Sequence, residues 1–312
     1  MTTPGDHRAP SLVAVVGPTA TGKSDLGIAL ARELGGEIVN ADAIQLYRGL
    51  DVGTAKLTRT EWAGVPHHLL DVLDVTETAS VAAYQRAARA IVERLLAAGR
   101  TPVLVGGSGL YVQAVLDELE FPGTDPALRA ELEAELVVCG PEVLHTRLAA
   151  LDPTAAAAVL PGNGRRIVRA LEVIALTGRP FPARLPTPGP PRYGAVLIGV
   201  DRDTEELDDR IGRRVARMFA AGLVEETRGL LPRGLREGRT ASRALGYQQV
   251  LTALDGSGEL TDAAADTVRA TRRFVRRQRS WFRRDRRIRW LDAAAPDLLE
   301  QARAQLAVVP AP

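Results

Sequence analysis

A short turn near the start of the chain constrains the fold more than any other feature. Its residues are Gly17, Pro18, Thr19, Ala20, Thr21, Gly22, Lys23 and Ser24. An apolar segment, 12–16, precedes the turn, and apolar residues at helical spacing follow it as far as Gly35. This order of strand, glycine-rich turn and helix is typical of the phosphate-binding P-loop. We expect the backbone N–H groups and Lys23 to surround an anion, and Ser24 to bind Mg²⁺.

Further segments alternate between strand and helix after the turn. A strand expected over 37–41 ends at Asp42, and the apolar run 102–107 follows a helical pattern that begins at Ser80. Another strand is expected over 195–200. Alternation at these lengths predicts an α/β fold, a P-loop NTPase-like parallel sheet flanked by helices.

The middle of the chain follows a different pattern. Helical spacing predominates after residue 118, and six prolines over 180–191 favour an extended linker that cannot be a regular helix. We therefore expect a helical insertion domain over 119–189. The catalytic core is expected to consist of 1–118 and 190–312, and its second part to include a C-terminal basic helical segment.

The ends of two strands carry candidate site residues, because the carboxyl ends of parallel strands form a crevice. Asp42 closes one strand, and this position suits a catalytic base, although an aspartate that caps a turn or helix has the same spacing. The glycine-rich turn 106–109 closes another strand, and it either faces the same crevice or serves only as a turn. His67 and His68 lack further ligands at zinc-like spacing, so we interpret them as packing residues.

Arginine is concentrated near the C-terminus. Eleven arginines and a single acid, Asp285, occur over 269–289, whereas the whole chain has a net charge of only +2. A segregated basic segment with interleaved aromatic residues predicts a polyanion-binding face, with RNA as the leading partner. The alternative is a solvated helix. The last residues, 304–312, are expected to be unstructured.

Composition excludes several other classes of protein. Cys139 is the single cysteine, so neither a disulfide framework nor a thiolate metal cluster is expected. The first residues are polar and long apolar runs are absent, which argues against a signal peptide and a membrane span. We expect a cytoplasmic protein with no membrane partner.

The ordered set of motifs resembles one family. The strings GPTATGKS, IVNADAIQLYRGLDVGTAK, HHLLDV, PVLVGGSGLYV, RRIVRALEV, SRALGYQQV and RRFVRRQRSWFRRD occur in the order and spacing of the tRNA dimethylallyltransferases, also called isopentenyl-tRNA transferases. The resemblance implies transfer of a dimethylallyl group from dimethylallyl diphosphate to the exocyclic N6 of the adenosine immediately following the anticodon. The tRNAs concerned read codons that start with U, and diphosphate is released. The resemblance also implies a monomer with no obligate protein partner.

Catalytic roles follow from the resemblance, residue by residue. Asp42 matches the family's base, which must remove a proton from a weakly nucleophilic amine as the C–N bond forms. Thr19, Lys23 and Arg243 are expected to contact the diphosphate, and Arg243 alternatively holds tRNA beside it. Mg²⁺ is expected as a cofactor, held in part by Ser24.

The resemblance also implies a surface for the tRNA anticodon stem-loop, with the insertion domain closing over the loop. The expected tRNA-binding residues are Asp42, Ala43, Ile44, Gln45, Ser108, Arg165, Arg166, Arg169, Arg243, Gly246, Tyr247, Gln248, Arg276 and Arg277. The chain departs from the usual pattern where Ala43 replaces a serine and Ser108 replaces a threonine. The segment PGNGRR also lacks an aspartate that often precedes the paired arginines.

Two other functions are compatible with a P-loop, because the turn does not disclose whether it binds ATP, GTP or another diphosphate. A kinase that phosphorylates a small metabolite would use the same strand, turn and strand-end aspartate. Such a kinase has no need of an arginine-rich, aromatic segment, however. A non-catalytic RNA-binding NTPase switch would need a base-recognition motif, and none is evident in the sequence.

Overall fold

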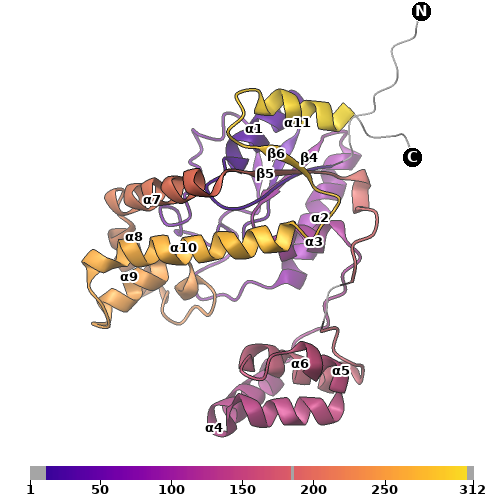
Figure 1. Cartoon of the computed structure of the whole chain (residues 1–312), viewed down its shortest axis with the longest axis vertical. Helices are drawn as coiled ribbons and strands as arrows, with labels where there is room; N and C mark the ends of the chain where they lie inside the picture. The colour runs from indigo at the N-terminus through magenta and orange to yellow at the C-terminus, as the bar shows by residue number, and fades with distance from the viewer. Residues whose placement is uncertain (1–11, 184–185, 308–312) are drawn as a thin grey trace, which may run out of the picture. The chain divides into compact units, whose positions relative to one another are not determined.

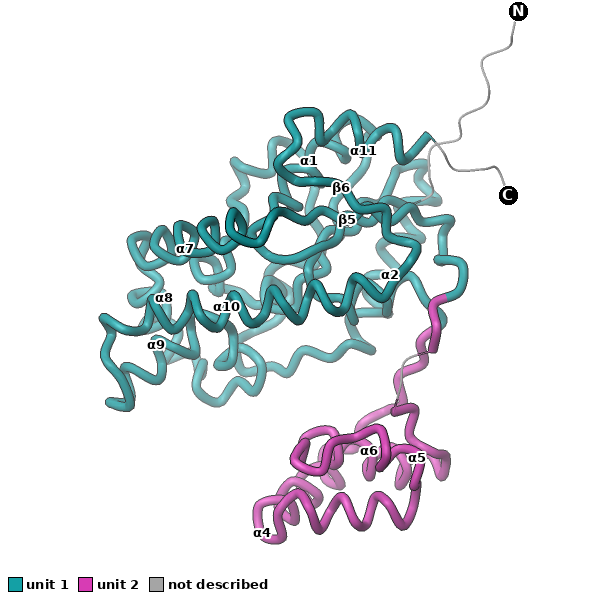
Figure 2. The backbone as a smooth tube through the Cα atoms, viewed as in Figure 1, with its two compact units in different colours: residues 1–118, 189–312 teal, residues 119–188 magenta. Residues whose placement is uncertain are grey.

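The computed structural model describes residues 12–183 and 186–307, so the expected polar leader lies outside the described part of the chain. The chain divides into two compact units (Figure 2). Unit 1 comprises Met1–Glu118 and Gly189–Pro312, and unit 2 comprises Leu119–Pro188. The expected insertion, 119–189, differs from unit 2 by one residue at its second boundary.

Unit 1 is built on a six-stranded sheet in which every pairing is parallel. The strands lie in the order β3-β2-β4-β1-β5-β6. Their bounds are β1 (Val13–Val16), β2 (Glu37–Asn40), β3 (His67–His68), β4 (Pro102–Gly106), β5 (Val196–Asp201) and β6 (Arg289–Asp292). Because β1 lies between β4 and β5, the P-loop that follows β1 stands at the centre of the carboxyl edge, where parallel sheets place their ligands.

Helices cover both faces of this sheet, as Figure 1 shows. The helices of unit 1 are α1 (Lys23–Glu33), α2 (Val81–Ala97), α3 (Gly109–Leu116), α7 (Thr204–Ala220), α8 (Leu223–Leu230), α9 (Tyr247–Leu254), α10 (Leu260–Phe282) and α11 (Leu298–Ala307), with the short 3-10 helices η1 (Arg192–Gly194), η2 (Leu231–Arg233) and η3 (Ala241–Arg243). The expected helix cap is present, because the Ser80 hydroxyl accepts the Ala83 N–H at 3.4 Å.

The packing explains why β1 is apolar at every position. Ala14 and Val16 face a cluster formed with α2 and α3, whereas Val13 and Val15 face a cluster formed with α1 and α11. A parallel strand covered on both faces needs apolar side chains throughout. The predicted P-loop NTPase-like α/β fold is therefore confirmed.

Two strands and a helix differ from the sequence-based expectations. Strand β3 has only two residues, too few for a periodic signal. Strand β6 begins at the last arginine of the arginine-rich segment, and its four residues, two of them charged, alternate between half-buried and exposed. The expectation that 304–312 is unstructured is wrong for 304–307, which belong to α11. Its Ala302 and Leu306 pack against the α1 face of the sheet. Residues 308–312 lie outside the described part.

Unit 2 is a separate helical body with its own apolar core. It contains α4 (Pro126–Leu151), α5 (Pro153–Ala158) and α6 (Gly164–Thr177). Helix α4 is interrupted at Gly140, whose φ of 79° lies outside the helical region, and Pro141 follows. The buried carboxylate of Glu172 pairs with Arg129 and Arg169, which joins α6 to the start of α4. No helix in the described parts of either unit could cross a membrane.

Candidate active site

The P-loop begins where the backbone approaches β5 too closely for any side chain. Gly17 has φ of 139°, and a Cβ added there would lie 2.2 Å from the Val200 carbonyl oxygen. Gly22, with φ of 99°, ends the turn, and α1 begins at Lys23. Glycine is required at position 17 by contact and by backbone conformation, which gives the motif its local physical cause.

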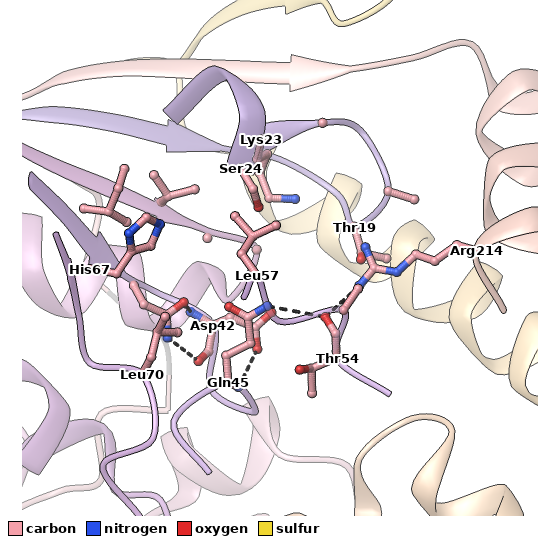
Figure 3. Close-up of a pocket in the computed structure, with 18 of the residues that line it drawn as sticks. Thr19, Lys23, Ser24, Asp42, Gln45, Thr54, Leu57, His67, Leu70 and Arg214 are labelled. Carbon is pink, nitrogen blue, oxygen red and sulfur yellow. Dashed lines mark hydrogen bonds between the residues drawn. The ribbon is translucent and has the colours of Figure 1, made fainter. Parts of the chain in front are cut away.

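A pocket opens beside this turn at the carboxyl edge of the sheet (Figure 3). It brings together the following predicted residues: Thr19, Ala20, Gly22, Lys23, Ser24, Asp42 and Gln45. Thr19 and Arg214 lie at one end of the pocket, and His67 and Leu70 lie at the other, with Asp42 between them. The remaining P-loop residues Gly17, Pro18 and Thr21 form the turn behind this lining.

Asp42 both caps a turn and faces the pocket. Its Oδ1 atom accepts the N–H groups of Ile44 at 2.9 Å and Gln45 at 3.4 Å. The Asn40 side chain holds the Asp42 backbone, because it accepts the Asp42 N–H at 3.0 Å and donates to the Asp42 carbonyl at 3.1 Å. Asn40 also donates to the Leu69 carbonyl at 2.9 Å. The two alternatives for Asp42, turn residue and site residue, are therefore compatible, and the turn fixes the carboxylate.

Lys23 is the cation of the P-loop, and its ammonium group donates to the Pro18 carbonyl. The pKa of Lys23 is lowered to about 7, chiefly by burial and in addition by the charge of Arg214, while the charges of Asp42 and Asp201 act in the opposite direction. An anion bound beside Lys23 would favour its charged form. The pocket therefore offers a cation whose charge responds to the ligand.

Helix α7 contributes four arginines to the pocket, and the sequence reasoning missed all of them. They are Arg210, Arg213, Arg214 and Arg217. Two are held by loop carbonyls: Arg210 donates to Ala20 at 2.9 Å, and Arg214 donates to Thr54 at 2.9 Å. Burial lowers the pKa of the Arg214 guanidinium. A signal for these arginines is present in the sequence. They recur at helical spacing along RIGRRVAR, beside a buried apolar stripe of the same helix.

The loop that holds Arg214 is itself anchored by Glu226 of α8. The Glu226 carboxylate accepts the N–H of Val52 at 2.9 Å and of Gly53 at 3.3 Å. The Tyr247 hydroxyl donates to the same carboxylate at 2.5 Å. A Cβ on Gly53 would lie 2.4 Å from the Tyr247 ring, so the loop packs directly on it.

The second glycine-rich turn faces the same pocket, through Gly106 and Gly107. A Cβ on Gly106 would lie 2.2 Å from the Ala41 carbonyl oxygen. The absence of a side chain at Gly106 therefore lets the end of β4 lie close to the end of β2. The Ser108 hydroxyl accepts the Ala43 N–H at 3.1 Å. Ser108 thus fixes the backbone beside Asp42, whichever residue stands at position 43.

His67 and His68 have different surroundings. His68 forms a 2.6 Å contact with Glu37 at the edge of the sheet, in agreement with a packing role. His67 instead lines the pocket and stacks on Trp62 with ring centroids 4.5 Å apart. Burial lowers the pKa of His67. The interpretation of His67 as a packing residue alone is therefore corrected.

Other predicted residues lie away from the pocket. Arg243 is exposed at the end of η3 and is not part of the pocket lining. Gly246 and Tyr247 are buried, and Tyr247 supports the loop described above rather than a surface open to RNA. Gln248 and Arg277 both line a pocket between α9 and α10.

The predicted arginines of unit 2 have mixed surroundings. Arg165 and Arg166 are exposed on α6. Arg169 is half-buried and donates to the carbonyls of Pro122 at 2.7 Å and Gly123 at 3.0 Å. Its side chain thus connects α6 to the segment before α4, so a structural role accompanies any contact with RNA.

The arginine-rich segment, 269–289, is not a uniform basic face. Arg279 binds Asp201 at 2.9 Å, and Arg287 binds Asp117 at 2.5 Å and Asp285 at 2.7 Å. The exposed members are Arg269, Arg273, Arg276, Arg277, Arg283, Arg284 and Arg286. The solvated or RNA-facing part of the segment is therefore smaller than its charge suggests.

Comparisons with known proteins agree with this geometry. A family model described as IPP transferase matches residues 45–285. The tRNA dimethylallyltransferase of Saccharopolyspora erythraea is 70% identical over 298 residues, which cover 96% of each chain. That of Streptomyces coelicolor is 64% identical and covers 97% of each chain.

Solved structures are similar over almost the whole chain. A tRNA isopentenylpyrophosphate transferase from Bacillus halodurans is 40% identical with a TM-score of 0.70, covering 95% of this chain and 96% of that one. A eukaryotic dimethylallyltransferase acting on tRNA has a TM-score of 0.77 at 24% identity, covering 94% of this chain and 77% of that one. The latter likeness shows the shared fold.

Proposed function

The chain belongs to the IPP transferase family, and from that premise we propose that it transfers a dimethylallyl group from dimethylallyl diphosphate to tRNA. The acceptor is the exocyclic N6 of the adenosine immediately following the anticodon, in tRNAs that read codons starting with U. The products are N6-dimethylallyladenosine and diphosphate. The observation that carries this proposal is a single pocket that holds a fixed carboxylate, Asp42, beside a cluster of cations.

Asp42 serves as the general base. An exocyclic adenine amine is a poor nucleophile, so its proton must leave as nitrogen bonds to the allylic carbon. The turn of Ile44 and Gln45 holds Oδ1, so the carboxylate keeps one orientation while the target base enters. The base must first be unstacked from the anticodon loop, which costs a few kcal/mol.

The P-loop and α7 hold the diphosphate leaving group. Negative charge grows on the diphosphate as its bond to the allylic carbon breaks, so cations placed around it stabilise the transition state. Lys23, Arg214 and the loop amides supply that charge from two sides of the pocket. Arg214 lines the pocket and joins the residues proposed to contact the diphosphate, whereas the contact of Arg243 with diphosphate or tRNA stays a prediction.

The pocket residues are suited to a Mg²⁺ ion that binds together with the diphosphate substrate. No cluster of three or more His, Cys, Asp or Glu side chains within residues 12–183 and 186–307 could hold a metal by itself. The exposed Ser24 hydroxyl is a suitable oxygen ligand at the P-loop, and diphosphate oxygens would supply further ligands. When bound there, Mg²⁺ would neutralise part of the diphosphate charge.

The kinase alternative is not retained, because the relatives are tRNA dimethylallyltransferases.

Exposed arginines of α10 and of α6 would meet the phosphates of the anticodon stem-loop. In this arrangement the P-loop binds the leaving group of a prenyl donor rather than a phosphoryl donor.

The direct test supplies unmodified tRNA, Mg²⁺ and labelled dimethylallyl diphosphate to the full chain, with labelled ATP in a parallel reaction. Label is expected on tRNA from the prenyl donor alone. Asp42→Ala is expected to reduce turnover by about 10² to 10⁴ and to leave tRNA binding within about threefold, as for loss of a general base. Asp42→Asn is the matched variant of similar size. Consumption of ATP without prenyl transfer would refute the proposal.

A further inference from the structure

Gln278 is a buried amide in the middle of the arginine-rich helix. Val275 and Phe282 are buried on the same side of α10, one helical turn before and after it. Its neighbour Arg277 is exposed, whereas the Gln278 residue is only 6% exposed. A buried amide costs free energy unless both its N–H and its C=O groups are paired, so the partners of Gln278 show what its position achieves.

Both ends of the amide bond loops of the active site. Its Nε2 donates to the Gly107 carbonyl at 2.9 Å, and its Oε1 accepts the Thr19 N–H at 3.0 Å. A Cβ on Gly107 would lie 2.4 Å from Nε2, so the amide fits against bare backbone. One side chain near the C-terminus therefore connects the P-loop after β1 to the glycine-rich turn after β4.

This connection changes what the P-loop offers to a ligand. The N–H groups of a P-loop ordinarily face the bound anion. Here the Thr19 N–H is directed to Gln278 instead, while Thr19 remains in the pocket lining. The bond therefore fixes the backbone at the first part of the turn and leaves the amides from Ala20 onward for the anion.

We propose that Gln278 is a positioning residue for the diphosphate: it holds Thr19 against the Gly107 turn, so that the P-loop keeps its anion-binding shape. This inference rests on the proposed function, because the ligand concerned is the diphosphate of the prenyl donor. Gln278 is not part of the pocket lining, so it acts on the ligand only through the two loops that it holds.

The test measures binding of inorganic diphosphate, with Mg²⁺ and without tRNA, to the full chain by calorimetry. Gln278→Leu keeps the volume and removes both hydrogen bonds, and it is expected to weaken binding by about 10-fold. Thr267→Val is the matched control, a buried substitution in α10 whose hydroxyl bonds the Ala263 carbonyl of the same helix. The control is expected to bind diphosphate within about twofold of the wild type.

A second variant separates positioning from packing through its pH profile. In Gln278→Glu, an ionised carboxylate accepts the Thr19 N–H but repels the Gly107 carbonyl, whereas a protonated carboxyl can accept from one and donate to the other. Burial raises the pKa of a carboxyl group toward neutrality. The affinity of Gln278→Glu relative to the wild type is therefore expected to recover as the pH falls from about 8 to about 6.

Each outcome decides the proposal. A ratio of the two affinities that does not change between about pH 8 and about pH 6 would overturn the positioning role. A Gln278→Leu variant that is folded by circular dichroism and binds like the wild type would also overturn it. A wild type that binds no diphosphate would contradict the proposed function itself, whereas a wild type that binds it and a Gln278→Leu variant that binds equally well would contradict the positioning role alone.

Discussion

Helix α7 and the segment 269–289 both carry many arginines, yet they use them differently. Four arginines of α7 line the pocket beside the P-loop. No arginine of 269–289 is part of that lining, and the half-buried Arg279 and Arg287 pair with carboxylates of the same unit. The number of positive charges in a segment therefore does not locate the anion site. The residues packed around each arginine decide whether it meets a ligand, a carboxylate or solvent.

The largest effect is expected from the α7 side of this comparison. Arg214→Ala should lower kcat/KM for the prenyl donor by about 10² to 10³, because it removes a charge that faces the leaving group. Steady-state kinetics with varied donor will measure the change. Arg284→Ala, in the exposed part of 269–289, should leave the KM for the donor unchanged. Equal effects of the two variants would abolish the distinction between the two regions.

The next largest effect is expected on the free energy of unfolding, from an arginine of 269–289 that is held by carboxylates. Arg287 lies between the carboxylates of Asp117 and Asp285, and its side chain is 17% exposed. Burial alone would lower the pKa of Arg287, but the two carboxylates raise it. Arg287→Ala should therefore reduce the free energy of unfolding by about 3 kcal/mol, because two buried carboxylates lose their partner.

Urea denaturation will measure that loss, and the exposed neighbour Arg286 supplies the control. Arg286→Ala should change the free energy of unfolding by less than about 0.5 kcal/mol. If both variants were equally stable, the division of the segment into structural and exposed arginines would be wrong.

The exposed face of α10 should act on tRNA rather than on the donor. Replacing Arg273, Arg276 and Arg277 together by glutamine is expected to weaken tRNA binding about 10-fold at low salt. The slope of log K against log salt should fall in magnitude by about 0.7 to 0.9 for each lost phosphate contact. Filter binding at several salt concentrations will test this. An unchanged slope would return this face to the solvated-helix interpretation.

The smallest expected effect is on the pH dependence of diphosphate affinity, and it distinguishes Lys23 from the arginines around it. The pKa of Lys23 is lowered to about 7, so its charge is present below that pH and is lost above it. Diphosphate affinity should therefore fall about fivefold between pH 7 and pH 8, as the protonated fraction of a group with that pKa does. Lys23→Met should not show this fall. A wild-type affinity that is independent of pH would mean that the arginines alone supply the charge.

Sequence patterns were sufficient where neighbouring residues decide the structure. The apolar strand, the glycine-rich turn and the amphipathic α1 are local, so the P-loop could be placed residue by residue. Asp42 could be placed because a parallel strand must end at the carboxyl edge, where β1 also ends. The same reasoning brought the turn at Gly106 and Gly107 to the pocket.

Motif position was insufficient where contacts between distant residues decide the role. Arg243 stands in a motif shared with the family, but η3 places it away from the pocket lining. Tyr247, in the same motif, is buried against Gly53, nearly two hundred residues earlier in the chain. Its hydroxyl oxygen accepts the Gly53 N–H at 3.1 Å. Neither placement follows from the residues adjacent to the motif.

The sequence by itself determined the four longer strands expected for the sheet, the P-loop, the position of Asp42 at a strand end and the separate helical insertion, because each depends on periodicity or on a turn within one short segment. Only the tertiary structure decided which arginines face the pocket and which are held by carboxylates, and it alone showed that Gln278 joins two loops. The physical reason is that charges and amides take their roles from partners brought together by folding, and sequence spacing carries no record of those partners.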